Sequence, residues 1–78
     1  MKKVKLIWDF RGPNADKIAE HHEIHLNEFI LTKHLEGCET GVEQLSEMFS
    51  IAFIIVDEKH TIPLRDALKP HRGELVDE

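Results

Sequence analysis

Histidine is the residue type whose number and spacing first suggest chemistry. Six histidines occur among the 78 residues, and His21 and His25 lie four positions apart. In a helix the two rings would share one face, and Glu28 would continue the same stripe. Imidazole nitrogens and carboxylate oxygens are common ligands of divalent transition metals. The spacing therefore predicts a candidate site for Zn²⁺ or Ni²⁺ at His21, His25 and Glu28.

This histidine stripe differs from the signature of the zinc metalloproteases. Their pattern H-E-x-x-H requires glutamate directly after the first histidine, but His22 occupies that position. Further ring ligands would have to come from distant parts of the chain, where His34, His60 and His71 are the candidates. The competing interpretation is a solvated, histidine-rich helix flank that holds no cofactor.

His22 differs from its neighbours because it falls within the apolar stripe of the predicted helix. At about 100° per residue, that stripe spans about 120°. It contains Ala15, Ile18, Ala19, His22, Leu26, Phe29 and Ile30. Burial disfavours the charged imidazolium, so His22 is a candidate pH-sensitive residue of the core. The alternative is a neutral core histidine that is hydrogen-bonded to the backbone.

A basic cluster near the C-terminus is the second candidate site. Arg65 and Lys69 lie at i and i+4 on a predicted short helix, and Arg72 follows two residues after Pro70. These three cations predict an anion-binding site at Arg65, Lys69 and Arg72. A solvated helix face is the alternative, and no glycine-rich phosphate-binding motif is present to support a nucleotide.

Catalysis has little support in the sequence. Cys38 is the single cysteine, so an intrachain disulfide is excluded, and an unpaired thiol fits a reducing cytoplasm. A thiolate nucleophile needs a placed base. The nearest histidine along the chain, His34, is separated from Cys38 by the helix-ending Gly37, while Ser46 and Ser50 have no His–Asp context. We therefore expect a protein that is not an enzyme.

The elements that must position these residues follow from hydrophobic periodicity. Residues 4–10 alternate with period two, as in a strand. Asn14 is a predicted N-cap for a helix that runs from Ala15 to Leu35 and ends at Gly37. Residues 48–56 are apolar on both faces, which predicts a central strand covered on both sides.

The remaining segments give weaker signals. Residues 39–45 fit either a short helix with a capping box or a strand paired with residues 48–56, and we favour the strand. A short helix over residues 61–69, with proline in its first turn, precedes an edge strand over residues 73–76. The order predicts one α+β domain, residues 1–78, of the ferredoxin-like βαββαβ type. Its sheet would be mostly antiparallel, with two helices on one face.

Charge and length restrict the functions that remain. The net charge of −5 disfavours binding to a phosphate backbone, so no nucleic-acid partner is expected. No apolar run is long enough to span a membrane or to form the core of a signal peptide, so no membrane partner is expected either.

The predicted fold leaves one sheet face without helices. That face would expose three or four large residues of the strand over residues 48–56 beside Ile7, although the sequence does not determine which side is the outer one. We therefore expect a small non-enzymatic cytoplasmic module that forms a homodimer and binds a partner or a small-molecule ligand. A metal-binding protein that uses the histidine and glutamate stripe is the alternative.

Overall fold

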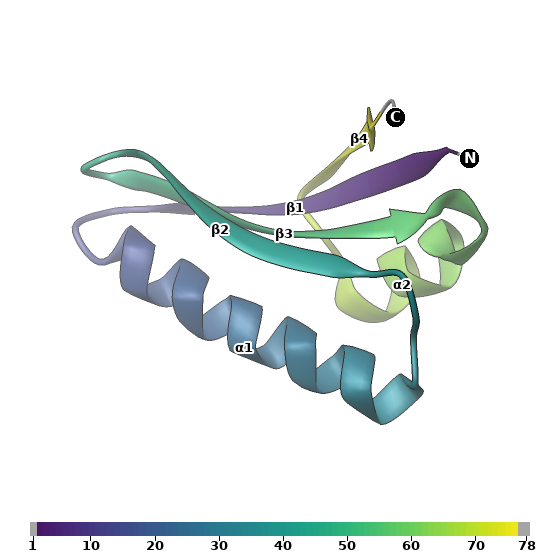
Figure 1. The fold of residues 1–78 in the computed structure, drawn as a ribbon. Coiled ribbons are helices and arrows are strands. Elements are labelled where there is room, and N and C mark those ends of the chain that lie inside the picture. The colour runs from purple at the N-terminus through teal and green to yellow at the C-terminus, as the bar shows by residue number, and fades with distance from the viewer. Residues whose placement is uncertain (1, 77–78) are drawn as a thin grey trace.

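The computed structural model describes residues 2–76, which form one antiparallel sheet and two α-helices (Figure 1). The elements follow the order β1 (Lys3–Arg11), α1 (Ala15–Lys33), β2 (Glu39–Ser46), β3 (Phe49–Asp57), η1 (Glu58–His60), α2 (Thr61–Leu68) and β4 (Arg72–Val76). The element η1 is a short 3-10 turn before α2. The α+β class, the antiparallel sheet and the two helices agree with the prediction.

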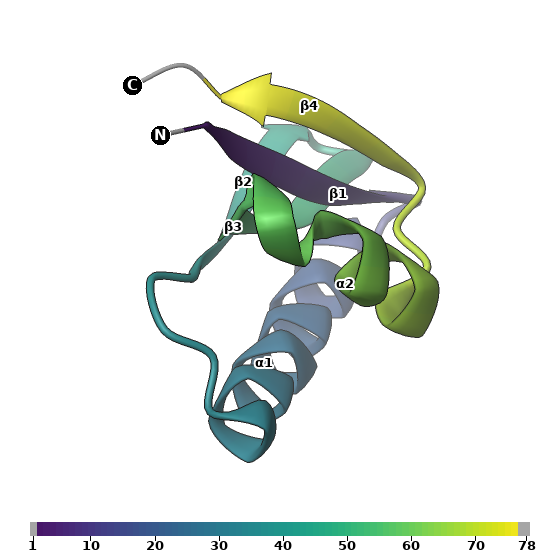
Figure 2. The same cartoon turned by 90° about the vertical axis from the view of Figure 1, so that its right-hand side faces the viewer.

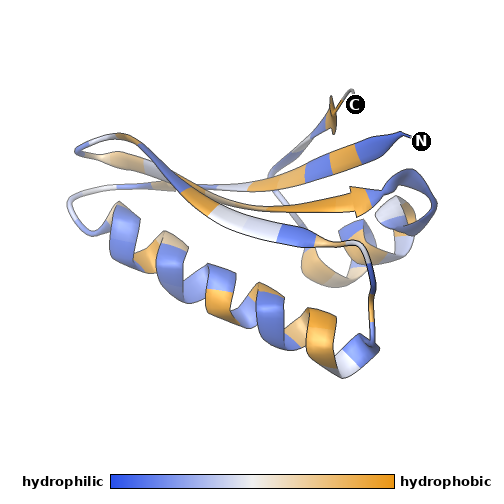
Figure 3. Ribbon diagram, in the orientation of Figure 1, coloured by the Kyte–Doolittle hydropathy of each residue, from blue (hydrophilic) through white to orange (hydrophobic). Residues whose placement is uncertain are grey.

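The sheet has the strand order β2-β3-β1-β4, and each neighbouring pair is antiparallel. The strand β3 is central and appears as a long hydrophobic stretch in Figure 3. The ambiguous segment 39–45 is confirmed as a strand, because β2 pairs along its length with β3. The turn between them falls at residues 47–48.

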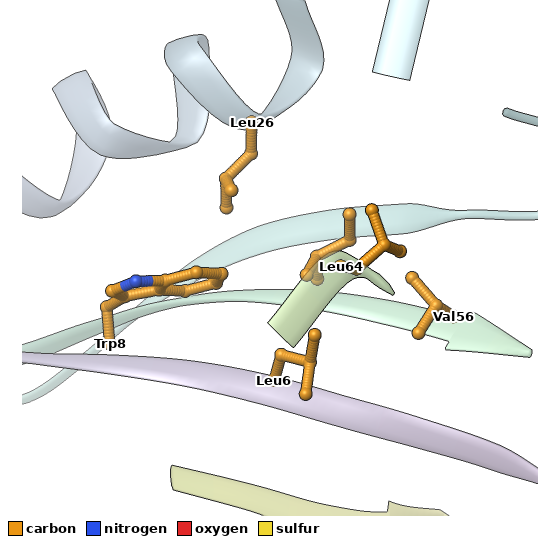
Figure 4. Packing of buried hydrophobic residues seen from close by; sticks show 6 residues of the cluster. Leu6, Trp8, Leu26, Val56 and Leu64 are labelled. Carbon is orange, nitrogen blue, oxygen red and sulfur yellow. The ribbon is translucent and has the colours of Figure 1, made fainter. Parts of the chain in front are cut away.

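Both helices lie on the same side of the sheet (Figures 1 and 2). The core between them and the sheet contains Leu6 and Trp8 of β1, Leu26 of α1, Val56 of β3 and Leu64 of α2 (Figure 4). Burial of each large side chain contributes about 1.5–3 kcal/mol. The indole N–H of Trp8 also donates a hydrogen bond to the Leu68 carbonyl, 3.3 Å away, which ties β1 to the end of α2.

Strand register decides which side of β3 faces outward. Leu6 lies opposite Ile54 and Trp8 lies opposite Ala52, and these pairs face the helices. The alternate residues form the open face, which we define as the sheet face without helices. Its residues are Lys5, Ile7, Asp9 and Arg11 of β1, Phe49, Ile51, Phe53 and Ile55 of β3, Glu39, Gly41 and Glu43 of β2, and Arg72 and Glu74 of β4.

The helix α1 begins at Ala15, as predicted, but it ends earlier than predicted. It stops at Lys33 instead of Leu35, because His34 adopts a left-handed conformation with φ of 54°. Asn14 does precede the first turn, but its side chain makes no capping hydrogen bond. Ile18, predicted to lie in the core, is 48% exposed. It lies on the flank of the apolar stripe, near the N-terminal end of α1. The helix α2 packs beside the C-terminal end of α1 and therefore does not cover Ile18 (Figure 1).

Within residues 2–76, neither helix combines the length and the apolar character that are needed to cross a membrane.

Candidate functional site

The helix α1 brings His21 and His25 together on its exposed flank. The two Nε2 atoms lie 3.1 Å apart, and the rings meet edge to face with centroids separated by 4.7 Å. This contact follows directly from the i, i+4 spacing, since residues one turn apart are neighbours on a helix. The pair therefore presents two ring nitrogens at one point on the surface.

Glu28 lies beside the same pair but on the other side of the His25 ring. Its Oε1 is 3.7 Å from Nδ1 of His25, the nitrogen that does not face His21. Within residues 2–76, no group of three or more histidine, cysteine, aspartate or glutamate side chains is arranged to hold a metal ion. His34 and His60 line a different cleft, at the C-terminal end of α1. The structure thus brings together the two Nε2 atoms of His21 and His25, with the Glu28 carboxylate on the far side of the His25 ring.

His22 is half-buried at the corner where α1 meets β1. Its ring lies against Trp8 and Phe10, with centroid separations of 4.6 and 5.5 Å, and its Nε2 is buried without a hydrogen-bond partner. Desolvation lowers the pKa of His22, and the nearby His25 and His71 lower it further by charge repulsion. The ring is therefore held in its neutral form by its surroundings.

The segment between α2 and β4 completes this corner. The ring of His71 lies 6.3 Å from that of Phe10, and its Nδ1 accepts a hydrogen bond of 2.9 Å from the backbone N–H of Asp9. Arg72 donates to both carboxylate oxygens of Asp9 at 3.2–3.3 Å and to Glu74 at 2.8 Å. Asp9 and Glu74 were not candidates from the sequence, because Asp9 and Arg72 meet only through the pairing of β1 with β4.

The three predicted anion-binding residues are only partly brought together. Arg65 and Arg72 line one cleft of about 390 Å³ between α2 and β4, whereas Lys69 ends α2 in a left-handed conformation outside that lining. The hydrogen bond to Asp9 is the main cause of the raised pKa of Arg72. Asp9 and Glu74 therefore offset the charge of Arg72, and the Arg65 guanidinium lies 3.8 Å from the Asp66 carboxylate, so each guanidinium that lines this cleft already has a carboxylate beside it.

The open face is better covered than the sequence predicted. Ile7 and Ile51 are only 1% and 3% exposed, while Phe49, Phe53 and Ile55 are half-buried. The expectation that three or four large residues of this strand lie exposed beside Ile7 is therefore only partly met, because Phe49, Phe53 and Ile55 keep some exposure while Ile7 and Ile51 are covered by their neighbours.

Two of the covering groups are cations on β1. Lys5 Nζ lies 4.3 Å from the centroid of the Phe53 ring, and the Arg11 guanidinium lies 4.2 Å from that of Phe49. The charged ends of both side chains therefore lie over the faces of the two rings and shield them from water. On its other side, the Phe53 ring lies over Gly41, where a Cβ atom would collide with Cζ of that ring. This close approach explains why glycine stands in the middle of β2.

The single thiol is not activated by its surroundings. Cys38 is half-buried at the edge of the core, and its Sγ lies 3.8 Å from the Glu36 carbonyl oxygen. Burial raises the pKa of Cys38, and this effect outweighs the opposite influence of Lys3. A raised thiol pKa reduces the fraction of reactive thiolate at neutral pH.

Comparison with known proteins places this geometry in no family. No family model matches the chain, and neither the curated proteins nor the solved structures contain a significant match. The functional argument therefore depends on the residues themselves.

Proposed function

We propose that this protein is a small non-enzymatic interaction module that forms a homodimer through the open face of its sheet. The observation that carries the proposal is the distribution of side chains on that face. Half-buried Phe49, Phe53 and Ile55 on β3 lie between a largely basic row on β1 and an acidic row on β2. A central apolar area with charged groups at its rim is typical of protein interfaces.

The strand register defines the two charged rows. Lys5 and Glu39 both lie opposite Ile55, one on each side of it. Arg11 lies further along the β1 row, and Glu43 lies further along the β2 row. The acidic residue of the β1 row, Asp9, is already paired with Arg72. The charge that remains is therefore positive on β1 and negative on β2.

A twofold axis along β3 would make this arrangement complementary to itself. It would place β1 of one copy over β2 of the second copy, so that Lys5 would meet the Glu39 carboxylate of that copy. The same contact would form twice, because a twofold interface is isologous. The rings of Phe53 and the side chains of Ile55 would pack at the centre and lose their remaining contact with water.

The proposal also covers the topology of the chain. We assign the ferredoxin-like βαββαβ plan, supported by the antiparallel order β2-β3-β1-β4 with β1 and β3 in the centre and by two helices on one face. This topology describes how the open face arises and carries no activity of its own.

The proposal also includes a cytoplasmic location, a small-molecule ligand and the lack of an enzymatic role. Burial raises the pKa of Cys38, which supports a structural thiol, and a single cysteine fits a reducing compartment. The cleft between α2 and β4 offers the place for a small ligand, since it is lined by Val4 and Leu6, by the guanidinium of Arg65, and by Thr61, whose hydroxyl is buried without a partner.

Light scattering on the purified chain at micromolar concentration tests the assembly. We expect twice the mass of one chain for the wild type and the mass of one chain for Phe53→Lys and Ile55→Lys. The matched control is Ile62→Lys, because Ile62 is an exposed apolar residue of α2, away from the open face. A wild-type monomer, or a dimer that survives both substitutions with its fold intact, would contradict the proposal.

Charge reversal tests the orientation of the two copies. Lys5→Glu and Glu39→Lys should each weaken the dimer by placing like charges opposite one another. The double variant should restore it, since the swapped charges again attract. If the dimer affinity lost in the double variant equals the sum of the losses in the two single variants, the twofold axis does not run along β3.

A further inference from the structure

The His21–His25 pair has the separation that a chelated metal ion requires. The two Nε2 atoms lie 3.1 Å apart. Two ring nitrogens, each at 2.0–2.1 Å from one ion, are about 2.9–3.4 Å apart for coordination angles between octahedral and tetrahedral values. The same two atoms therefore meet the distance condition before any ion arrives. They now share a single hydrogen-bonding proton, which an ion would displace, and the rings would turn so that both lone pairs point at the ion.

The helix holds this geometry in place. Both residues lie in the middle of α1, which runs from Ala15 to Lys33, so neither is subject to fraying at a helix end. Both side chains are exposed, so an ion can reach the two nitrogens and keep water at its other positions. A disordered pair of histidines would have to lose this conformational freedom on binding, whereas the helical pair has already lost it.

Glu28 stands where a carboxylate usually supports a metal-bound histidine. Its Oε1 lies 3.7 Å from Nδ1 of His25, on the side of the ring away from His21. A carboxylate at Nδ1 favours a proton on that nitrogen and leaves Nε2 as the free electron pair. Glu28 is therefore placed to orient the His25 ring.

The local charge also favours a cation. The helix α1 carries four acidic and two basic residues, so its own charge is negative. Such an excess of negative charge raises the concentration of cations near the surface.

We infer that His21 and His25 chelate one divalent transition-metal ion of the zinc or nickel class through their Nε2 atoms, with Glu28 as a positioning residue. Water fills the remaining coordination positions. The imidazole pair favours these ions over Mg²⁺ and Ca²⁺, which prefer oxygen ligands. The site is independent of the proposed dimer, because α1 lies on the opposite side of the sheet from the open face (Figure 1).

Calorimetric titration of Ni²⁺ and of Zn²⁺ into tag-free protein, stripped with a chelator and dialysed, tests the inference. We expect one ion per chain, with a loss of affinity of at least tenfold in both His21→Ala and His25→Ala. The matched control is His34→Asn, since His34 is exposed and asparagine tolerates its left-handed backbone. Equal binding by the wild type and both alanine variants, or no binding by the wild type, would overturn the site.

The test of Glu28 must distinguish a side chain that orients His25 from one that binds the metal ion itself. We expect Glu28→Gln to weaken binding by roughly tenfold while the Cu²⁺ form keeps the electron paramagnetic resonance spectrum of two bound imidazoles. A loss of one oxygen ligand from the wild-type spectrum in that variant would show that Glu28 coordinates the ion. An unchanged affinity would show that Glu28 has no part in the site. Either outcome overturns its assignment as a positioning residue.

Discussion

Replacement of Gly41 by alanine tests the packing at the centre of the open face. A Cβ atom at this position would collide with Cζ of Phe53 and would lie 2.8 and 3.1 Å from Cε2 and Cε1 of the same ring. The ring must then move outward from β2. In moving it would lose contact with Gly41 and alter its position relative to the Lys5 ammonium group, now 4.3 Å from its centroid.

Two opposing effects determine the size of the change in the free energy of unfolding. Alanine restricts the unfolded chain more than glycine does, which stabilises the strand by about 0.5–1 kcal/mol. Displacement of a packed side chain costs about 1–3 kcal/mol, and an exposed cation–π contact contributes about 0.5–1 kcal/mol. We therefore expect Gly41→Ala to destabilise the protein by about 1–2 kcal/mol, which lowers Tm by roughly 5–15 °C in a domain of this size.

The assay is urea denaturation followed by circular dichroism, at one protein concentration for every variant. In a Phe53→Ala background the obstructing ring is gone, so the same Gly41→Ala change should stabilise the protein by about 0.5–1 kcal/mol. Gly73→Ala is the matched control. A Cβ atom there would lie 3.5 Å from the nearest atom, Cδ2 of Leu6, which is an ordinary van der Waals contact.

The reversal of sign is the decisive result. If Gly41→Ala stabilises the wild type as much as it stabilises the Phe53→Ala variant, the Phe53 ring does not lie on the backbone of β2. The description of the open face as a covered aromatic surface would then be wrong.

Two further predictions concern the core. Leu26→Ala should lower the free energy of unfolding by about 2–5 kcal/mol in the same urea assay, because Leu26 is only 1% exposed. The control is Leu31→Ala on the outer side of α1. Leu31 is 74% exposed, so this change should alter stability by less than about 0.5 kcal/mol. With a chelator present, stability should be fully retained above the unfolded-state histidine pKa of about 6.5. It should fall as the pH decreases below that value. The reason is that the lowered pKa of His22 in the folded protein lets the unfolded chain bind the proton first. His22→Gln and His22→Leu should both flatten this pH dependence, and an unchanged slope in both would show that His22 is not its cause.

Local patterns in the sequence were sufficient to locate most of the elements. Period-two alternation identified β1, and two apolar faces identified β3 as central, because a strand covered on both sides needs apolar residues at every position. The same local rule placed His21 beside His25, since the i, i+4 relation depends only on helix geometry. These features are determined over distances of a few residues.

Other features were decided by tertiary structure. The strand β2 has few apolar residues, and its pairing with β3 is what excludes a helix there. Glu28 shares a helix face with His25, but the sequence could not predict which ring nitrogen it would approach, because that depends on side-chain rotation.

The pairing of Arg72 with Asp9 shows most clearly what local sequence patterns could not predict. The two residues are 63 positions apart, and they meet because β4 docks beside β1 in one particular register. A helix face containing Arg65 and Lys69 suggested an anion site, but the sheet supplies carboxylates that neutralise Arg72. Most of the secondary structure, β2 excepted, follows from local periodicity, whereas the net charge of a surface follows from which distant strands become neighbours. That choice is made by the packing of the whole core.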